Sequence, residues 1–205
     1  PFGHHSSLPS PGPPRSPWSL GLTAPASGTE RLAARRARVL SQRRLLGSAV
    51  VADASAAVAR RVADLVDGQP PGRVAAYFAT EGEVDPAPAI RRLRDGGWTV
   101  WFPVVPAGPP APMSFRHWDS PELPPAGRLG LLAPPEGAVE IEAADLDVVL
   151  VPLVVFGPGG VRAGRGGGYY DRTFACLAAA GAVRHGRPLL VGLAHLGAHA
   201  KGGFG

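Results

Sequence analysis

The chain has 205 residues, of which 45% are hydrophobic, and its formal net charge is +5. This length suits one sizeable domain with tails, and the hydrophobic share is large enough to form a core. We predict neither a membrane span nor a membrane partner, because no apolar run reaches about 18 residues. We also expect no signal peptide, since the sequence opens without a basic start and an apolar stretch. The single cysteine, Cys176, excludes an internal disulfide and favours a reducing compartment, which we take to be the cytoplasm.

The positive charge has a compositional explanation. Of the 21 basic residues only Lys201 is a lysine, and arginine is abundant together with alanine, glycine, proline and valine. This pattern is typical of a compositional bias of the source genome, and no interleaving of aromatic and basic residues accompanies it. We therefore expect no nucleic-acid partner. An RNA-binding module built on the arginine-rich segment 31–61 remains an alternative, and it predicts a steep salt dependence of RNA binding.

The chain divides into a tail and one domain. Residues 1–29 are rich in Pro, Ser and Gly and show no periodicity, so we predict a disordered tail. Residues 30–205 are predicted to form a single α/β domain. Its first part, up to Gly68, has apolar residues at helical spacing and predicts one broken helix or two helices, with Ser41 as a cap of the second.

Strands and helices then alternate along the domain. The predicted strands are 73–80, 98–105, a short one within 113–118, 145–156 and 188–195, and the predicted helices are 86–97 and 171–181. A strand, a helix and a strand in succession favour parallel pairing with a right-handed crossover. We therefore predict a three-layer α/β fold: a mainly parallel sheet with helices on both faces, preceded by an N-terminal helical arm.

A glycine-rich turn stands between the apolar run 145–156 and the helix 171–181. It reads GVRAGRGGGYYDR over residues 160–172. Glycines leave amide N–H groups uncovered, and the following helix adds its positive end, so the turn suits phosphate oxygens. Arginines add forked donors, and an aspartate could hold Mg²⁺ that bridges phosphates. The residues in question are Gly164, Gly166, Gly167, Gly168, Arg162, Arg165 and Asp171.

The residues alone leave simpler interpretations open for this turn. It contains neither a Walker motif nor the dinucleotide fingerprint, because its spacing is G-x-G-G-G. A glycine run is also typical of a flexible hairpin or of the start of a helix. Asp171 could equally be a plain helix cap.

The whole string VPLVVFGPGGVRAGRGGGYYDR resembles the 5-formyltetrahydrofolate cyclo-ligase family. The signature is an apolar strand ending in proline, a turn, an arginine, Gly-x-Gly-x-Gly and Tyr-Tyr-Asp. It falls here on Arg162, Gly164, Gly166, Gly168, Tyr169, Tyr170 and Asp171. Other stretches line up in order, so that the resemblance covers about residues 30 to 195.

This resemblance implies ATP-dependent closure of 5-formyltetrahydrofolate to 5,10-methenyltetrahydrofolate, with release of ADP and phosphate. Reduced folate and ATP would be the small-molecule partners, Mg²⁺ the cofactor, and the protein a monomer. The implied nucleotide site is Arg162, Gly164, Arg165, Gly166, Gly167, Gly168, Tyr169 and Tyr170, with Arg31 from the N-terminal helix. Asp171 is the implied Mg²⁺ ligand, and Glu83 and Phe78 are the implied folate contacts. Without the family, Glu83 would be a solvated loop carboxylate, Phe78 a core residue and Arg31 part of a solvated helix face.

The sequence departs from the family pattern in several places. A lysine of the N-terminal helix has no counterpart, Leu153 replaces a glycine, and Gly157 replaces an aspartate. A Pro-x-Glu segment and an aspartate that complete the family's metal site do not follow the last strand. His195 and His199 lack a third ligand. We therefore expect a domain that is incomplete at its carboxyl end, with weak or no turnover. The alternative function is a catalytically impaired homologue or fragment that binds nucleotide or folate without turnover.

Overall fold

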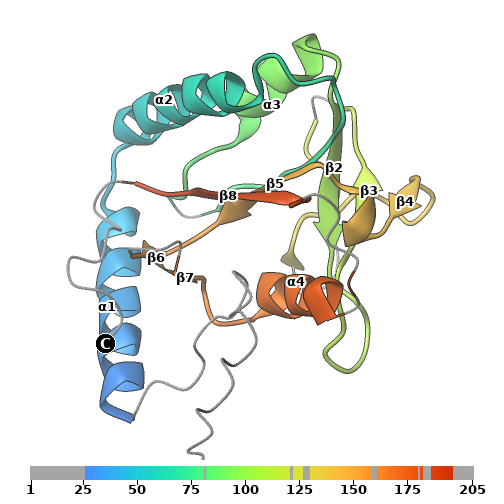
Figure 1. Cartoon of the computed structure of the whole chain (residues 1–205). Coiled ribbons are helices and arrows are strands. Elements are labelled where there is room, and N and C mark those ends of the chain that lie inside the picture. The colour runs from blue at the N-terminus through green and yellow to red at the C-terminus, as the bar shows by residue number, and fades with distance from the viewer. Residues whose placement is uncertain are drawn as a thin grey trace, which may run out of the picture.

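The architecture is a sheet covered by helices on both faces. A computed structural model describes residues 26–80, 82–120, 122–126, 130–157, 161–179, 181 and 186–195. In these residues, six strands form one sheet in the order β4-β3-β2-β1-β5-β8. Helices α2 (Ser48–Val66) and α3 (Ala87–Asp95) cover one face, and α4 (Tyr169–Ala179) covers the other (Figure 1). The predicted three-layer α/β fold is therefore confirmed.

The centre of the sheet is parallel and one of its edges is antiparallel. Strand β1 pairs in parallel with β2 and β5, and β5 pairs in parallel with β8. Strands β3 and β4 complete the sheet in antiparallel register beyond β2. The bounds are β1 Arg73–Ala75, β2 Thr99–Val104, β3 Ser114–His117, β4 Glu140–Ile141, β5 Val148–Pro152 and β8 Leu189–Leu193.

The two faces of the sheet build two cores. Val74 of β1 packs with Val100 and Val148 beneath α2 and α3, and all three are buried. The next residue in each strand points the other way, because side chains alternate along a strand. Ala75 and its neighbours Trp101 and Val149 therefore belong to the core beneath α4.

The helical arm consists of two helices with a break at residues 45–47. Helix α1 spans Ala26–Arg44 and so begins before Glu30, while residues 1–25 of the predicted tail lie outside the described part of the chain. The prediction that Ser41 caps the second helix is wrong, because Ser41 lies inside α1 and Gly47 is the N-cap of α2. No helix in the described ranges combines the length and apolarity that crossing a membrane requires.

The predicted strand 145–156 is in fact two strands in different sheets. The chain leaves the main sheet after Pro152, and β6 (Val155–Phe156) pairs with β7 (Arg162–Ala163) in a separate antiparallel ribbon. Helix α1 stands beside this ribbon, and its Val39 is buried against it (Figure 1). Both strands are buried, so the hydrophobic run gives no sign of the corner between them. The predicted strand 73–80 is also shorter, since β1 ends at Ala75.

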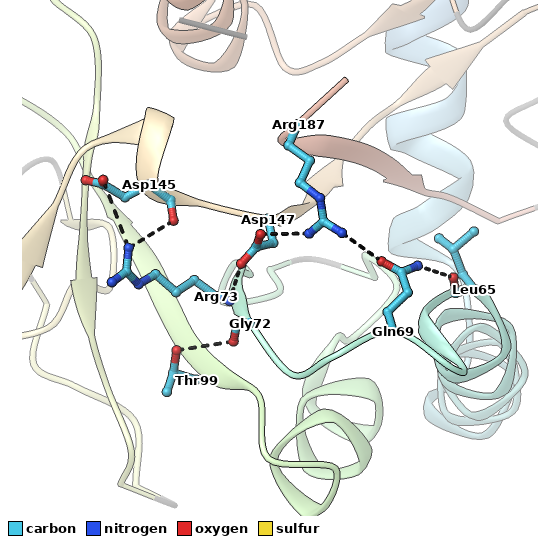
Figure 2. A network of polar contacts seen from close by, with 8 residues as sticks. All are labelled: Leu65, Gln69, Gly72, Arg73, Thr99, Asp145, Asp147 and Arg187. Carbon is cyan, nitrogen blue, oxygen red and sulfur yellow. Dashed lines mark hydrogen bonds and ion pairs between the residues drawn. The ribbon is translucent and has the colours of Figure 1, made fainter. Parts of the chain in front are cut away.

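A polar network ties the amino ends of the parallel strands together (Figure 2). The Asp147 carboxylate accepts the Arg73 amide at 2.9 Å on Oδ2 and Nη1 of Arg187 at 2.7 Å on Oδ1. Nη2 of Arg187 in turn donates to Gln69 Oε1 at 3.2 Å. A Cβ on Gly72 would lie 2.2 Å from Asp147 Oδ2, so only glycine allows this approach. The network connects the amino ends of the parallel strands. The loops that follow these strands lie at the opposite, carboxyl ends, which we call the carboxyl edge of the sheet.

Candidate functional site at the carboxyl edge of the sheet

Three segments meet at the carboxyl edge of the parallel strands, where ligands bind in open α/β sheets. They are the loop after β1, the glycine-rich turn before α4 and the residues after β8. Oε1 of Glu83, in the first segment, lies 3.3 Å from Nε of Arg165 in the second. Nε2 of His195, in the third, donates to the Gly82 carbonyl oxygen at 2.9 Å. The fold thus gathers residues that the sequence keeps far apart.

The acidic loop after β1 holds its carboxylate in a fixed position. Oε2 of Glu83 accepts the Thr80 amide at 3.0 Å and the Thr80 hydroxyl at 3.3 Å. The Tyr77 hydroxyl donates to the Val84 carbonyl oxygen at 2.6 Å, and burial, reinforced by the charge of Glu83, raises the pKa of Tyr77. Glu83 is only 8% exposed. Glu83 is therefore a buried carboxylate with hydrogen-bond partners and not a solvated loop side chain.

Phe78 and Glu83 line one cleft of about 530 Å³. The Phe78 ring stacks on Phe102 at 4.1 Å between centroids with 8° between planes. Trp118 forms another wall, and Arg94 donates to its carbonyl oxygen. An apolar, aromatic cleft with a few fixed polar groups is typical of a small-molecule site. The structure therefore brings together the two residues that the sequence assigned to folate.

The glycine-rich turn presents its backbone rather than its side chains. Gly166 and Gly168 have φ of 110° and 64°, which favour glycine over any other residue. A Cβ built on Gly164 would meet no atom within 4 Å, so that glycine borders open space. Nη2 of Arg172 donates to the Gly167 carbonyl oxygen at 2.8 Å and fixes the turn to the first turn of α4. This exposed backbone at a helix amino end is the arrangement that phosphate groups require.

An ion pair and an aromatic ring accompany the turn. Nη2 of Arg162 donates to Oδ1 of Asp171 at 2.8 Å, and the Arg162 guanidinium lies 5.9 Å from the centroid of the Tyr170 ring. Burial raises the pKa of the Tyr170 phenol, and the nearby Arg162 guanidinium opposes this rise. Tyr169 lies at the start of α4 with Arg172 above its ring, at 5.0 Å. The turn and its aromatic residues form one structural unit.

Asp171 is the residue of the turn that could hold Mg²⁺, as a single protein ligand. Its side chain is 36% exposed, and its Oδ1 already accepts Arg162. Within the described residues, no three His, Cys, Asp or Glu side chains come together as a metal site. Mg²⁺ bound with a nucleotide commonly takes one or two carboxylates plus phosphate oxygens. Asp171 suits that arrangement if it shares its carboxylate between the metal and Arg162.

Arg31 is the predicted site residue that the structure leaves apart. Its side chain is exposed. Arg43, at the other end of α1, lies about 18 Å further along the helix at 1.5 Å per residue, and it is this end that meets Gly82. The role of Arg31 remains a prediction.

Sequence reasoning missed Arg43, which is 3% exposed and donates to the Leu153 carbonyl oxygen. One signal was available. Arg43 follows Val39 by four residues and so lies on the apolar stripe of α1, where a buried charge is unusual.

The fold and site define a class of protein: a three-layer α/β domain with an aromatic, acidic cleft beside a glycine-rich turn at the carboxyl edge of its sheet. The model of the 5-formyltetrahydrofolate cyclo-ligase family matches residues 28–198, and the chain belongs to that family. The resemblance seen in the sequence is therefore confirmed.

Individual relatives agree with this assignment. The 5-formyltetrahydrofolate cyclo-ligase of Escherichia coli is 33% identical over 101 residues, which are 49% of this chain and 56% of that protein. The chain thus spans about half the length of the curated relatives it matches. The structure of the Aquifex aeolicus 5,10-methenyltetrahydrofolate synthetase matches with a TM-score of 0.61 and 26% identity, covering 82% of this chain and 79% of that one. The Mycoplasma pneumoniae synthetase, at 19% identity, shares the fold with a TM-score of 0.62, covering 82% and 88%.

Proposed function

We propose that the protein catalyses the ATP-dependent cyclisation of 5-formyltetrahydrofolate to 5,10-methenyltetrahydrofolate. The formyl oxygen is a poor leaving group. Transfer of the γ-phosphoryl group of ATP to that oxygen forms an O–P bond and releases ADP. Attack of N10 on the formyl carbon then forms the C–N bond, and the C–O bond breaks with departure of phosphate.

The observation that carries this proposal is the ion pair between Glu83 and Arg165. It joins the cleft that suits a planar, partly apolar ring to the turn that suits phosphates. A phosphoryl transfer between two bound substrates requires such adjacency, because most of its catalysis is positioning and charge stabilisation. The two sites meet at one ion pair, which supports a transfer between them.

The predicted site residues other than Arg31 receive roles under this proposal. Phe78 packs against the pterin, and Glu83 accepts hydrogen bonds from its N–H groups. Arg165 and the amides of Gly164, Gly166, Gly167 and Gly168 bind the polyphosphate, and Tyr169 and Tyr170 form the wall behind it. Asp171 would hold Mg²⁺, which neutralises phosphate charge when bound, and Arg162 keeps the Asp171 carboxylate in place.

A direct assay tests the proposal. The protein is incubated with 5-formyltetrahydrofolate and MgATP, while methenyltetrahydrofolate is followed by its absorbance and phosphate by a coupled assay. We expect the two products in equal amounts, and in Glu83→Gln we expect the rates of formation of both products to fall together at subsaturating folate. Formation of methenyl product without ATP, or phosphate release without folate at the same rate, would overturn the proposal.

A second candidate is a protein that binds nucleotide or folate without turnover. The observation in its favour is that the Asp171 carboxylate is already engaged by Arg162. Calorimetry with ATP and with folate, beside the turnover assay, separates the two candidates. Binding of both without product supports the second.

The partners and setting follow from the proposed reaction. We propose reduced folate and ATP as the partners of a monomer that acts in the cytoplasm, without nucleic acid. Gel filtration coupled to light scattering tests the oligomeric state, and a second subunit in the eluted species would contradict it.

A further inference from the structure

The structure contains a buried arginine that the proposed chemistry does not use. Arg43 is 3% exposed, although charged side chains are almost never fully buried without a partner. Its Nη2 donates to the Leu153 carbonyl oxygen. Its Nε and Nη1 are buried and have no hydrogen-bond partner among the described residues. A buried guanidinium with unpartnered nitrogens destabilises the folded state. Its presence is therefore better explained by a role in function than by a contribution to stability.

Arg43 joins the acidic loop to the residues that follow β5. Through Nη2 it holds the chain where it leaves the main sheet after β5. Its backbone lies directly against Gly82, since a Cβ there would be 2.5 Å from the Arg43 carbonyl oxygen. Gly82 precedes Glu83, the carboxylate of the cleft, and has φ of 69°. Arg43 therefore contacts the acidic loop and the end of β5 simultaneously.

The charge of Arg43 also bears on Glu83. Burial lowers the pKa of the Arg43 guanidinium, and the nearby Glu83 carboxylate opposes this lowering. Glu83 thus interacts with two arginines, since it pairs with Arg165 on the glycine-rich turn and acts electrostatically on Arg43 at the end of α1. Arg165 is 43% exposed and can turn to a phosphate, whereas Arg43 is enclosed and cannot leave.

We propose that Arg43 is a positioning residue for folate: it keeps the Gly82–Glu83 turn fixed against the end of β5, so that Glu83 faces the cleft when Arg165 engages the nucleotide. This inference rests on the proposed function for its substrate. Arg43 acts through Glu83 and through the Leu153 carbonyl, not by contact with the substrate. Its removal therefore weakens folate binding much more than nucleotide binding.

The experiment compares the wild-type chain with Arg43→Met, Arg43→Lys and Arg38→Met. Methionine keeps the approximate length of the side chain and removes its charge. Lysine keeps the charge but replaces the three guanidinium nitrogens by one ammonium nitrogen. Arg38→Met is the control, because Arg38 is an exposed arginine of the same helix. Two quantities are measured: the hydrogen-exchange rates of the amides of residues 80 to 84 in the protein alone, and the dissociation constants of 5-formyltetrahydrofolate and of a non-hydrolysable ATP analogue.

We expect Arg43→Met to raise exchange in residues 80 to 84 more than in the rest of α1 and β5. We expect it to weaken folate binding by about tenfold or more and nucleotide binding by less than about threefold, as loss of a buried charged hydrogen bond would. Arg43→Lys should lie between wild type and Arg43→Met, and Arg38→Met should match wild type. Equal loss of both affinities, or unchanged exchange in the loop, overturns the proposal.

The experiment remains decisive if a variant does not fold or if the wild-type chain binds no folate. If Arg43→Met does not fold, the same comparison of loop exchange and of the two affinities is made on Arg43→Lys, and an Arg43→Lys protein identical to wild type overturns the proposal. If the wild-type chain binds no folate, the proposed function fails, and the exchange pattern alone decides the role of Arg43. Faster exchange spread evenly over the domain would show a purely structural arginine.

Discussion

Glu83 and Arg165 form the ion pair that joins the cleft to the glycine-rich turn, with 3.3 Å between Oε1 and Nε. Glu83 is almost fully enclosed, whereas Arg165 is partly exposed. A polyphosphate that recruits Arg165 must therefore compete with Glu83 for the same guanidinium. The affinities of the two proposed substrates are then linked, and any such linkage acts equally in both directions.

The first prediction concerns the charge of Glu83. Glu83→Gln keeps the shape of the side chain but removes the charge that holds Arg165. We expect folate binding to weaken by about tenfold or more, because a buried charged acceptor is lost. Nucleotide affinity should stay equal or rise by up to about fivefold, which corresponds to the roughly 1 kcal/mol of a partly exposed ion pair. Calorimetry measures both, with the exposed Glu136→Gln as the control.

A fall of nucleotide affinity in Glu83→Gln, parallel to that of folate, would contradict this prediction. It would show that Glu83 supports the turn instead of competing for its arginine. A matching decline in both affinities for Glu136→Gln would point to a general effect of charge.

The second prediction separates ligand contact from backbone strain within the turn. Gly164→Ala should leave the free energy of unfolding within about 0.5 kcal/mol of wild type, because its Cβ would meet nothing within 4 Å. It should nonetheless weaken binding of an ATP analogue, since the new methyl group would occupy the space that phosphates require. Gly166→Ala should lower stability by about 1–2 kcal/mol, because φ there is 110°. Urea denaturation and calorimetry measure the two effects. Unchanged nucleotide affinity in Gly164→Ala would argue against the turn as a phosphate site.

The local motifs of the site were predictable because they are contiguous. The residues from Gly164 to Asp171 form one turn and the start of one helix, so the residue types alone predict the backbone conformation of this segment. The acidic loop was predictable for a related reason, as it follows a buried strand. The cleft beside Phe78 was expected only through the family, because its walls come from separate strands.

Contacts between residues that are far apart in the chain could not be predicted from the sequence. The burial of Arg43 depends on the Leu153 carbonyl, 110 residues away, and no local pattern encodes that meeting. The corner after Pro152 was missed since both β5 and β6 are buried, and hydrophobicity alone does not report a change of sheet. In each case the tertiary partner, not the local sequence, decides the outcome.

The third prediction tests the contact between α1 and the acidic loop. Gly82→Ala would place a methyl group 2.5 Å from the Arg43 carbonyl oxygen at a position with φ of 69°. Backbone atoms cannot move away as a flexible side chain can, so we expect a loss of about 2–4 kcal/mol in unfolding free energy. Gly137→Ala is the matched control, since it meets no atom within 4 Å. Equal stability of the two variants in urea denaturation would exclude the close approach.

The last prediction uses the network at the amino ends of the parallel strands (Figure 2). The candidate site lies at the opposite, carboxyl ends of these strands. Asp147→Asn would exchange an acceptor for an amide that faces Arg187, and it would weaken the hydrogen bond from the Arg73 amide. The Asp147 side chain is 31% exposed, so solvent screens part of the loss, and we expect about 1–2 kcal/mol of destabilisation. The affinities for folate and nucleotide should not change, because those ligands would bind at the carboxyl edge.

Asp64→Asn is the control variant. Asp64 lies on the exposed side of α2, so the substitution removes the same charge without affecting this network and should retain wild-type stability. A drop in ligand affinity for Asp147→Asn at temperatures where it is fully folded would show that the two edges are coupled, and the site could then no longer be treated as separate from the network.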